Sequence, residues 1–287
     1  MKTPGKTIQH AAIIVLSTAA FSSCKIAASL SDRQINRHFK NQTAKPVRKY
    51  LSYKQYHIHH VSMGDASKPL LLLVHGAPGA WYSYLSMLDN PELQANYHMV
   101  SVDRIGFDKS NSGIAVTSID EHVKYLEKIV EEYNTAGQKI YILGASYGAP
   151  IAAAFAMKNP DLVRELFLLS PVIDPSKEKI FWFSYLCRLS FINMWLEQSL
   201  NVATEEKFDH RHELRKLKPF WKNITCKTYV VMGKKDWIAD PRNFEFAQKM
   251  LVNADGAEFY LIENSGHAVM QTRPDLIRKL LLHQKIE

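Results

Sequence analysis

Several common signatures are scarce or missing in this sequence. It has only three cysteines among 287 residues, which excludes a scaffold held together by several disulfides. It contains neither an H-E-x-x-H motif nor paired C-x-x-C motifs, so we expect no metal and no other cofactor. No apolar run reaches the roughly 20 residues that a membrane-spanning helix needs. No internal repeat or low-complexity segment is present either.

The charge of the chain also narrows the possible partners. The formal net charge is +8 at pH 7. The basic residues are spread along the chain and do not cluster with aromatic residues, which argues against a nucleic-acid partner.

Short apolar runs alternate with helical patterns over most of the chain. This alternation predicts an α/β fold with a mainly parallel, doubly wound sheet that helices cover on both faces. Residues 171–224 interrupt the pattern and are too long for a simple connection, so we expect a small helical cap inserted there, over the active site. The expected strands are 70–74, 139–143, 166–170, 228–232 and 258–262, and the expected helices are 118–134, 149–157, 243–252 and 274–283.

A G-x-S-x-G motif at residues 144–148 follows one of these strands and precedes a helix. In that context the motif predicts a nucleophile elbow, a sharp turn that exposes Ser146. The turn needs small neighbours, which Gly144 and Gly148 supply. The motif also occurs by chance, and an ordinary turn serine is the alternative interpretation.

Candidate partners for the serine follow two later strands. Asp236 comes after the run at 228–232, and His267 comes after the run at 258–262. The carboxyl ends of parallel strands share one edge of a sheet, so we expect all three side chains to meet there. A serine hydroxyl becomes a good nucleophile when a histidine removes its proton and an acid orients that histidine. Asp174, after the strand at 166–170, is the rival acid.

A fourth motif, H-G-A-P-G at residues 75–79, directly follows the strand at 70–74. Backbone amides in such a loop can stabilise the negative charge that acyl transfer places on a carbonyl oxygen. Pro78 has no N–H, so the expected donors are the amides of Ala77 and of Tyr147, the residue after the serine.

These four motifs together resemble the α/β-hydrolase superfamily, from about Tyr56 to the C-terminus. The segment 103–110 is similar to the family's D-R-x-G-x-G-x-S turn, with Asp108 where a glycine is usual. This departure puts the local shape of the loop in question. By the same resemblance His75 is a structural residue, and we expect Asp103 to hold its turn through hydrogen bonds to the backbone.

The resemblance implies a serine hydrolase that forms an acyl-enzyme, and we expect a carboxylic ester with an apolar acyl group as substrate. Haloalkane dehalogenases and epoxide hydrolases use aspartate where this chain has Ser146. Proline iminopeptidases carry a similar H-G-x-P-G loop and are the first alternative. A lyase, a perhydrolase or a non-catalytic binding module on the same fold remain further alternatives. The cap acids that could bind a peptide's amine are Glu178, Glu197, Glu205 and Glu206.

The N-terminus has the pattern of a secretory signal: two lysines, an apolar stretch at residues 8–21, then small residues. Cys24 follows two serines, which resembles a bacterial lipobox. The interpretation is a signal peptide at 1–23, lipid on Cys24, a basic tether at 24–49 and a catalytic domain at 50–287. The resemblance implies an extracytoplasmic, membrane-anchored lipoprotein, at the outer membrane if the cell has one. A plain cleaved signal with a soluble product, or an uncleaved anchor, are the alternatives. Pairing of Cys187 with Cys226 stays open.

Overall fold

The computed structural model describes residues 30–42, 44–189 and 193–286. The chain divides into two compact units after His38. In the first unit the described helix is α2 (Asp32–His38), which lies within the predicted basic tether. The second unit, from Phe39 onward, contains the sheet and the candidate site.

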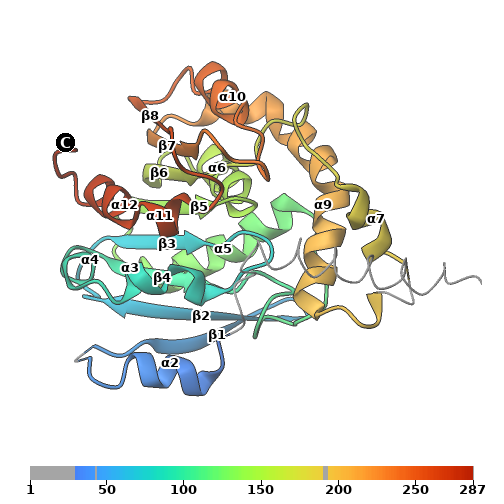
Figure 1. Ribbon diagram of the computed structural model, residues 1–287. Helices are drawn as coiled ribbons and strands as arrows, with labels where there is room; N and C mark the ends of the chain where they lie inside the picture. Colours follow the sequence, from blue (N-terminus) through green and yellow to red (C-terminus); the bar gives the residue numbers. More distant parts are fainter. Residues whose placement is uncertain (1–29, 43, 190–192, 287) are drawn as a thin grey trace, which may run out of the picture. The chain divides into compact units, whose positions relative to one another are not determined.

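An eight-stranded sheet organises the second unit, with strand order β1-β2-β4-β3-β5-β6-β7-β8 (Figure 1). From β4 to β8 all neighbouring strands are parallel, whereas β2 runs antiparallel to both β1 and β4. The strands are β1 (Val47–Tyr53), β2 (Tyr56–Gly64), β3 (Leu70–Val74), β4 (His98–Val102), β5 (Ile140–Ala145), β6 (Val163–Leu169), β7 (Lys227–Gly233) and β8 (Ala257–Ile262). The predicted mainly parallel sheet is confirmed.

Helices cover both faces of this sheet (Figure 1). Residues alternate between the two faces of each strand, so Leu72 and Val74 of β3 pack in the same core as the apolar faces of α5 and α6. Ser118 caps α5 by accepting a hydrogen bond from the Glu121 amide. The helices around the sheet are α3 (Leu85–Leu88), α4 (Pro91–Asn96), α5 (Ile119–Tyr133), α6 (Gly148–Lys158), α10 (Asn243–Met250), α11 (Val269–Thr272) and α12 (Pro274–Leu281), with a 3₁₀ helix η1 (Trp81–Tyr84).

The segment between β6 and β7 forms the expected helical cap. Its described helices are α7 (Trp182–Cys187), α9 (Gln198–Leu217) and the 3₁₀ helix η2 (Lys218–Asn223). The long connection therefore folds as an insertion into the α/β pattern, as the sequence predicts.

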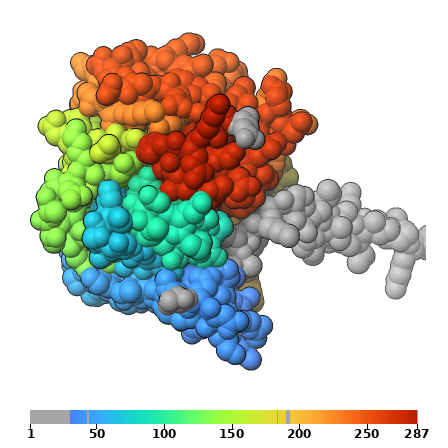
Figure 2. Space-filling model, turned by 90° about the vertical axis from the view of Figure 1, so that its left-hand side faces the viewer, coloured from blue at the N-terminus to red at the C-terminus, as the bar shows by residue number. Residues whose placement is uncertain are grey.

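The C-terminal helix packs beside the segment that joins β3 to β4. Figure 2 shows α12, in dark red, next to the blue-green surface of this segment. Arg278 of α12 bonds to Glu92 of α4 at 2.5 Å, and the Tyr97 hydroxyl donates to the Leu281 carbonyl. These contacts fix α12 against the segment that joins β3 to β4.

Candidate active site

The backbone around Ser146 forms a strained, tightly packed turn between β5 and α6. Ser146 has φ of +52°, a left-handed conformation that is unusual for a residue with a side chain. A Cβ atom on Gly144 would lie 2.3 Å from the Gly148 carbonyl oxygen, and one on Gly148 would lie 2.1 Å from the Val74 carbonyl oxygen. Only glycine fits at these two positions, and the turn holds the serine at the carboxyl edge of the sheet.

Three side chains from separate loops meet at this edge. The Oγ atom of Ser146 lies 2.9 Å from Nε2 of His267, and Nδ1 of His267 lies 2.7 Å from Oδ2 of Asp236. The loops can approach because Gly233 has no side chain: a Cβ there would lie 2.2 Å from the Gly266 carbonyl oxygen. In this geometry the Asp236 carboxylate can hold the proton on Nδ1, which leaves Nε2 free to accept the serine proton.

Asp236 is buried, and the backbone around it fixes the orientation of its carboxylate. Its Oδ1 atom accepts hydrogen bonds from the amides of Ile238 and Ala239, both at 2.9 Å. The rival acid, Asp174, accepts a hydrogen bond from the Ser176 amide at 2.8 Å within its own turn. The carboxylate that contacts His267 is therefore that of Asp236.

The loop after β3 lies against the nucleophile. A Cβ on Gly76 would be 3.0 Å from the Ser146 Cβ, so the Gly76 backbone is in contact with the serine. Among the described residues, the amides of Ala77 and Tyr147 donate to no protein acceptor. Both are therefore available to a ligand oxygen beside Ser146.

His75 is completely buried and supports this loop from behind. Its Nε2 accepts a hydrogen bond from the Arg104 amide at 3.0 Å, so Nδ1 carries the proton and donates to the Gly76 carbonyl at 2.7 Å. Burial, reinforced by the Arg104 charge, holds the pKa of His75 well below its usual value, so the ring is neutral. The D-R-x-G segment is the only signal in the sequence for Arg104. Glu206, which accepts hydrogen bonds from Arg104, is expected from the sequence only as a candidate acid for a peptide's amine.

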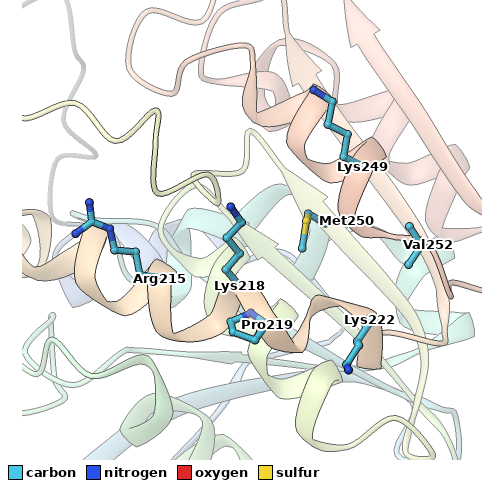
Figure 3. Close-up of a pocket in the computed structure, with 7 residues that line it drawn as sticks. All are labelled: Arg215, Lys218, Pro219, Lys222, Lys249, Met250 and Val252. Atoms are coloured by element: carbon cyan, nitrogen blue, oxygen red, sulfur yellow. The ribbon is translucent and has the colours of Figure 1, made fainter.

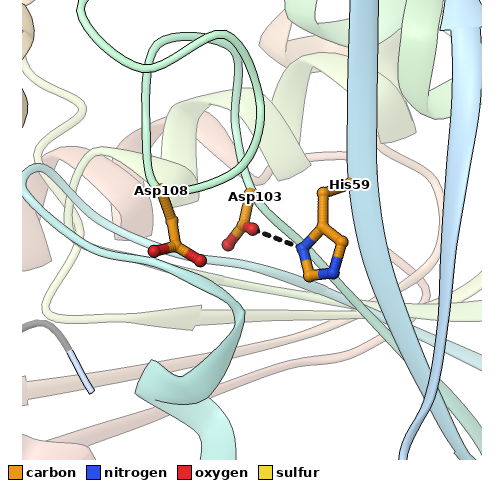
Figure 4. A group of neighbouring side chains, drawn as sticks. All are labelled: His59, Asp103 and Asp108. Carbon is orange, nitrogen blue, oxygen red and sulfur yellow. Dashed lines mark hydrogen bonds and ion pairs between the residues drawn. The ribbon is translucent and has the colours of Figure 1, made fainter. Parts of the chain in front are cut away.

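The group in the described chain that could supply metal ligands is His59, Asp103 and Asp108 (Figure 4). Both oxygens of Asp103 are engaged, one by the Trp81 amide at 2.7 Å and one by Nδ1 of His59 at 2.6 Å. A direct hydrogen bond of that length leaves no space for an ion between the two groups, so we assign no metal here. Burial and the Asp103 charge raise the pKa of Asp108 to about 6.

Asp108 adopts φ of +43°, which a glycine would tolerate more readily. The loop nevertheless keeps a compact turn, because the Ser110 amide donates to the Phe107 carbonyl and the Gly106 amide donates to the Ser110 carbonyl. The unusual aspartate thus adds a charge to this turn without opening it.

A surface cavity of about 480 Å³ lies between the η2 segment and the end of α10, and no triad or oxyanion residue lines it. The head groups of Lys218 and Lys222 point in opposite directions there (Figure 3), so the cations do not converge on one point. The lining residues are Arg215, Lys218, Pro219, Lys222, Lys249, Met250 and Val252.

The cap presents large apolar side chains to solvent. The exposed fraction is 73% for Trp182 and 83% for Trp195. Trp237, beside the acid, is also exposed, and its ring contacts that of Phe181 at 5.8 Å between centroids. Exposed aromatic surface of this kind is typical of sites that bind apolar ligands or partners.

Other predictions concern the cysteines and the N-terminus. Cys187 and Cys226 are both free thiols, and burial raises the pKa of Cys226 to about 11. The predicted signal peptide and the lipid attachment at Cys24 lie outside the described residues. Within the described part of the chain, no helix has the length and apolar character needed to cross a bilayer.

Known proteins resemble the chain in both sequence and fold. The model of the alpha/beta hydrolase fold family matches residues 69–188. The monoacylglycerol lipase abhd6-B of Xenopus laevis is 24% identical over 81% of this chain and 80% of its own. The proline iminopeptidase PfmaB of Pestalotiopsis fici is 27% identical over 75% of this chain and 91% of its own. The crystal structure of a bacterial membrane phospholipase A superposes with a TM-score of 0.65 at 20% identity, covering 97% of both chains.

Proposed function

Since the chain belongs to the α/β-hydrolase superfamily and is a hydrolase of that fold, we propose that it hydrolyses carboxylic esters through an acyl-enzyme on Ser146. One observation carries this proposal: the continuous hydrogen-bonded chain from Ser146 through His267 to Asp236, at 2.9 and 2.7 Å. This is the arrangement that serine activation requires.

The reaction has two halves. In the first, Oγ of Ser146 attacks the ester carbonyl carbon while Nε2 of His267 takes the hydroxyl proton. The amides of Ala77 and Tyr147 donate to the resulting oxyanion. The carbon–oxygen bond to the alcohol then breaks, and His267 returns the proton to the departing alcohol. In the second half His267 takes a proton from a water molecule, whose oxygen attacks the acyl carbon. The bond from that carbon to Oγ then breaks, and His267 gives the proton to Oγ, which releases the carboxylic acid and restores Ser146.

The cap favours an ester over a peptide with a free amino group. A peptidase of the proline iminopeptidase kind would need an acid free to bind the substrate's amine, but three of the four candidate acids already pair with basic groups. Glu206 pairs with Arg104, Glu205 with Arg188, and Glu178 with Lys207 and His210. The exposed aromatic residues of the cap suit an apolar acyl chain instead.

The similarities to two known enzymes suggest a substrate class and an alternative to it. The relatedness to a monoacylglycerol lipase supports a lipid-like ester, and the relatedness to a proline iminopeptidase keeps proline amides as the second candidate. The test is a panel of p-nitrophenyl esters of increasing acyl length together with proline p-nitroanilide. The proposal predicts at least a hundredfold higher kcat/KM on the best ester. Faster hydrolysis of the proline amide would replace the esterase assignment with a peptidase.

We also propose that the mature protein is an extracytoplasmic lipoprotein held to a membrane through Cys24. Support comes from the sequence around this cysteine, namely the basic start, the short apolar stretch and the small residues before it. In this arrangement residues 24–49 form a basic tether and residues 50–287 the catalytic domain, with the cap at about 171–224. Basic tethers are attracted to anionic lipid head groups.

A further inference from the structure

The peptide group between Gly76 and Ala77, beside Ser146, is held by two hydrogen bonds to its carbonyl oxygen. The carbonyl of Gly76 accepts hydrogen bonds from Nδ1 of His75 at 2.7 Å and from Nη2 of Arg104 at 3.0 Å. The N–H of the same peptide group belongs to Ala77 and has no acceptor among the described residues. The peptide is planar, so fixing the direction of its carbonyl also fixes the direction of this N–H.

Arg104 contacts both halves of the proposed oxyanion hole. Its side chain is fully buried, and Nε donates to the His75 carbonyl at 3.0 Å. Its guanidinium carbon lies 4.8 Å from the centre of the Tyr147 ring, within cation–π range. Arg104 therefore forms hydrogen bonds to the loop that carries the Ala77 amide, and it packs on the side chain of Tyr147, whose amide is the second donor.

A cap residue holds Arg104 in place. Glu206 of α9 is completely buried and accepts from Nη1 at 2.5 Å and from Nη2 at 3.1 Å. Nε2 of His122 lies 3.6 Å from Oε1 of the same carboxylate. A buried charge without its partner is costly, so the guanidinium and the carboxylate keep one another in position. The link joins the cap to the loop after β3.

We propose that Arg104 is a positioning residue that aims and polarises the Gly76–Ala77 peptide as an oxyanion donor, and that Glu206 couples the cap to this donor. The proposal rests on the proposed function, because the donor matters only if Ser146 attacks a carbonyl. Hydrogen bonds to the Gly76 oxygen draw electron density toward it and make the Ala77 N–H a stronger donor. A lysine could not replace the arginine, because only the planar guanidinium fork reaches two carbonyls and a carboxylate together.

The test compares an oxygen ester with the thionoester of the same acid. Thiocarbonyl sulfur is a weak hydrogen-bond acceptor, so the thionoester gains little from oxyanion donors. For Arg104→Lys we expect kcat on the oxygen ester to fall about 10- to 100-fold, somewhat less than the loss of a whole donor. We expect KM to change less than about twofold and kcat on the thionoester less than about threefold. For Glu206→Gln we expect kcat on the oxygen ester to fall about 3- to 10-fold, again with little change in kcat on the thionoester.

Glu213→Gln is the matched control, because Glu213 is a buried glutamate of the same helix that bonds to the Ile119 amide and to Lys216. For Glu213→Gln we expect kcat on the oxygen ester and kcat on the thionoester to change by the same factor. Urea unfolding checks that each variant is folded. Equal losses on both esters, no loss at all, the same split in the control, or failure of both test variants to fold would overturn the positioning role. Absence of wild-type turnover on the oxygen ester would instead reject the proposed function itself.

Discussion

Replacing Asp236 by asparagine should lower kcat for the best ester about 10⁴-fold, on the scale seen when a triad loses control of its histidine tautomer. The reason lies in the two amides, of Ile238 and Ala239, that donate to Oδ1. Only the carbonyl oxygen of an asparagine can accept those hydrogen bonds, so its NH₂ group must face His267. Nδ1 then has to accept, and the ring proton moves to Nε2.

That proton would point at Ser146 Oγ, 2.9 Å away, and the histidine could no longer take the serine proton. A 10⁴-fold loss corresponds to about 5.5 kcal/mol of transition-state stabilisation. The substitution conserves size and hydrogen-bond number, so the urea midpoint should stay close to that of the wild type. The assay is steady-state hydrolysis with active-site titration. Asp174→Asn is the control and should retain activity. A loss below about tenfold for Asp236→Asn, or a crippling loss for Asp174→Asn, would show that the acid is misassigned.

Three further predictions concern stability and location. Because the pKa of Asp108 is raised to about 6 in the folded chain, its proton is retained between about pH 4 and 6, and ionisation costs stability above that range. Asp108→Asn should therefore raise the free energy of unfolding by about 1–2 kcal/mol at pH 7.5, a value reduced for partial exposure, and by little at pH 4. A gain of the same size at both pH values would contradict this cause. Gly148→Ala should cost about 3 kcal/mol or more by urea unfolding, because its Cβ would meet the Val74 carbonyl at 2.1 Å. Gly137→Ala, where the space is open, should cost about 1 kcal/mol, and equal costs would refute the steric argument. Cys24→Ser should abolish palmitate incorporation and release the protein to the soluble extracytoplasmic fraction with its esterase activity intact. A wild-type protein that is already soluble and takes up no palmitate would replace the lipobox with a plain signal peptide.

Five of the six parallel strands could be predicted, because each contains a short, mostly apolar run between helices. The sixth, β4, was not predicted: its five residues include His98 and Ser101. The N-terminal hairpin of β1 and β2 could not be predicted in this way. In β1 two adjacent basic residues, Arg48 and Lys49, are followed by Tyr50 and Leu51, so apolar and polar residues do not alternate as they do in a half-buried strand. Its start at Val47 falls inside the segment interpreted as a tether, and so does α2.

The candidate site was predictable as far as it depends on local motifs at strand ends. Ser146, Asp236 and His267 each follow a strand of the same parallel sheet, so the sequence order alone indicates that they share an edge. The contacts that hold the oxyanion loop in place could not be predicted from local motifs. Arg104 and Glu206 are separated by 102 positions in the chain, and no local pattern pairs an arginine of a turn with a glutamate in a cap helix. Such a contact depends on how the cap packs on the sheet.

The most direct test of the account is covalent labelling of the nucleophile. A fluorophosphonate probe should react with the wild-type protein once per chain, and peptide mass spectrometry should place the adduct on Ser146. Ser146→Ala should be folded, unlabelled and inactive on every ester. An adduct on another residue, or undiminished labelling of Ser146→Ala, would contradict the serine hydrolase mechanism.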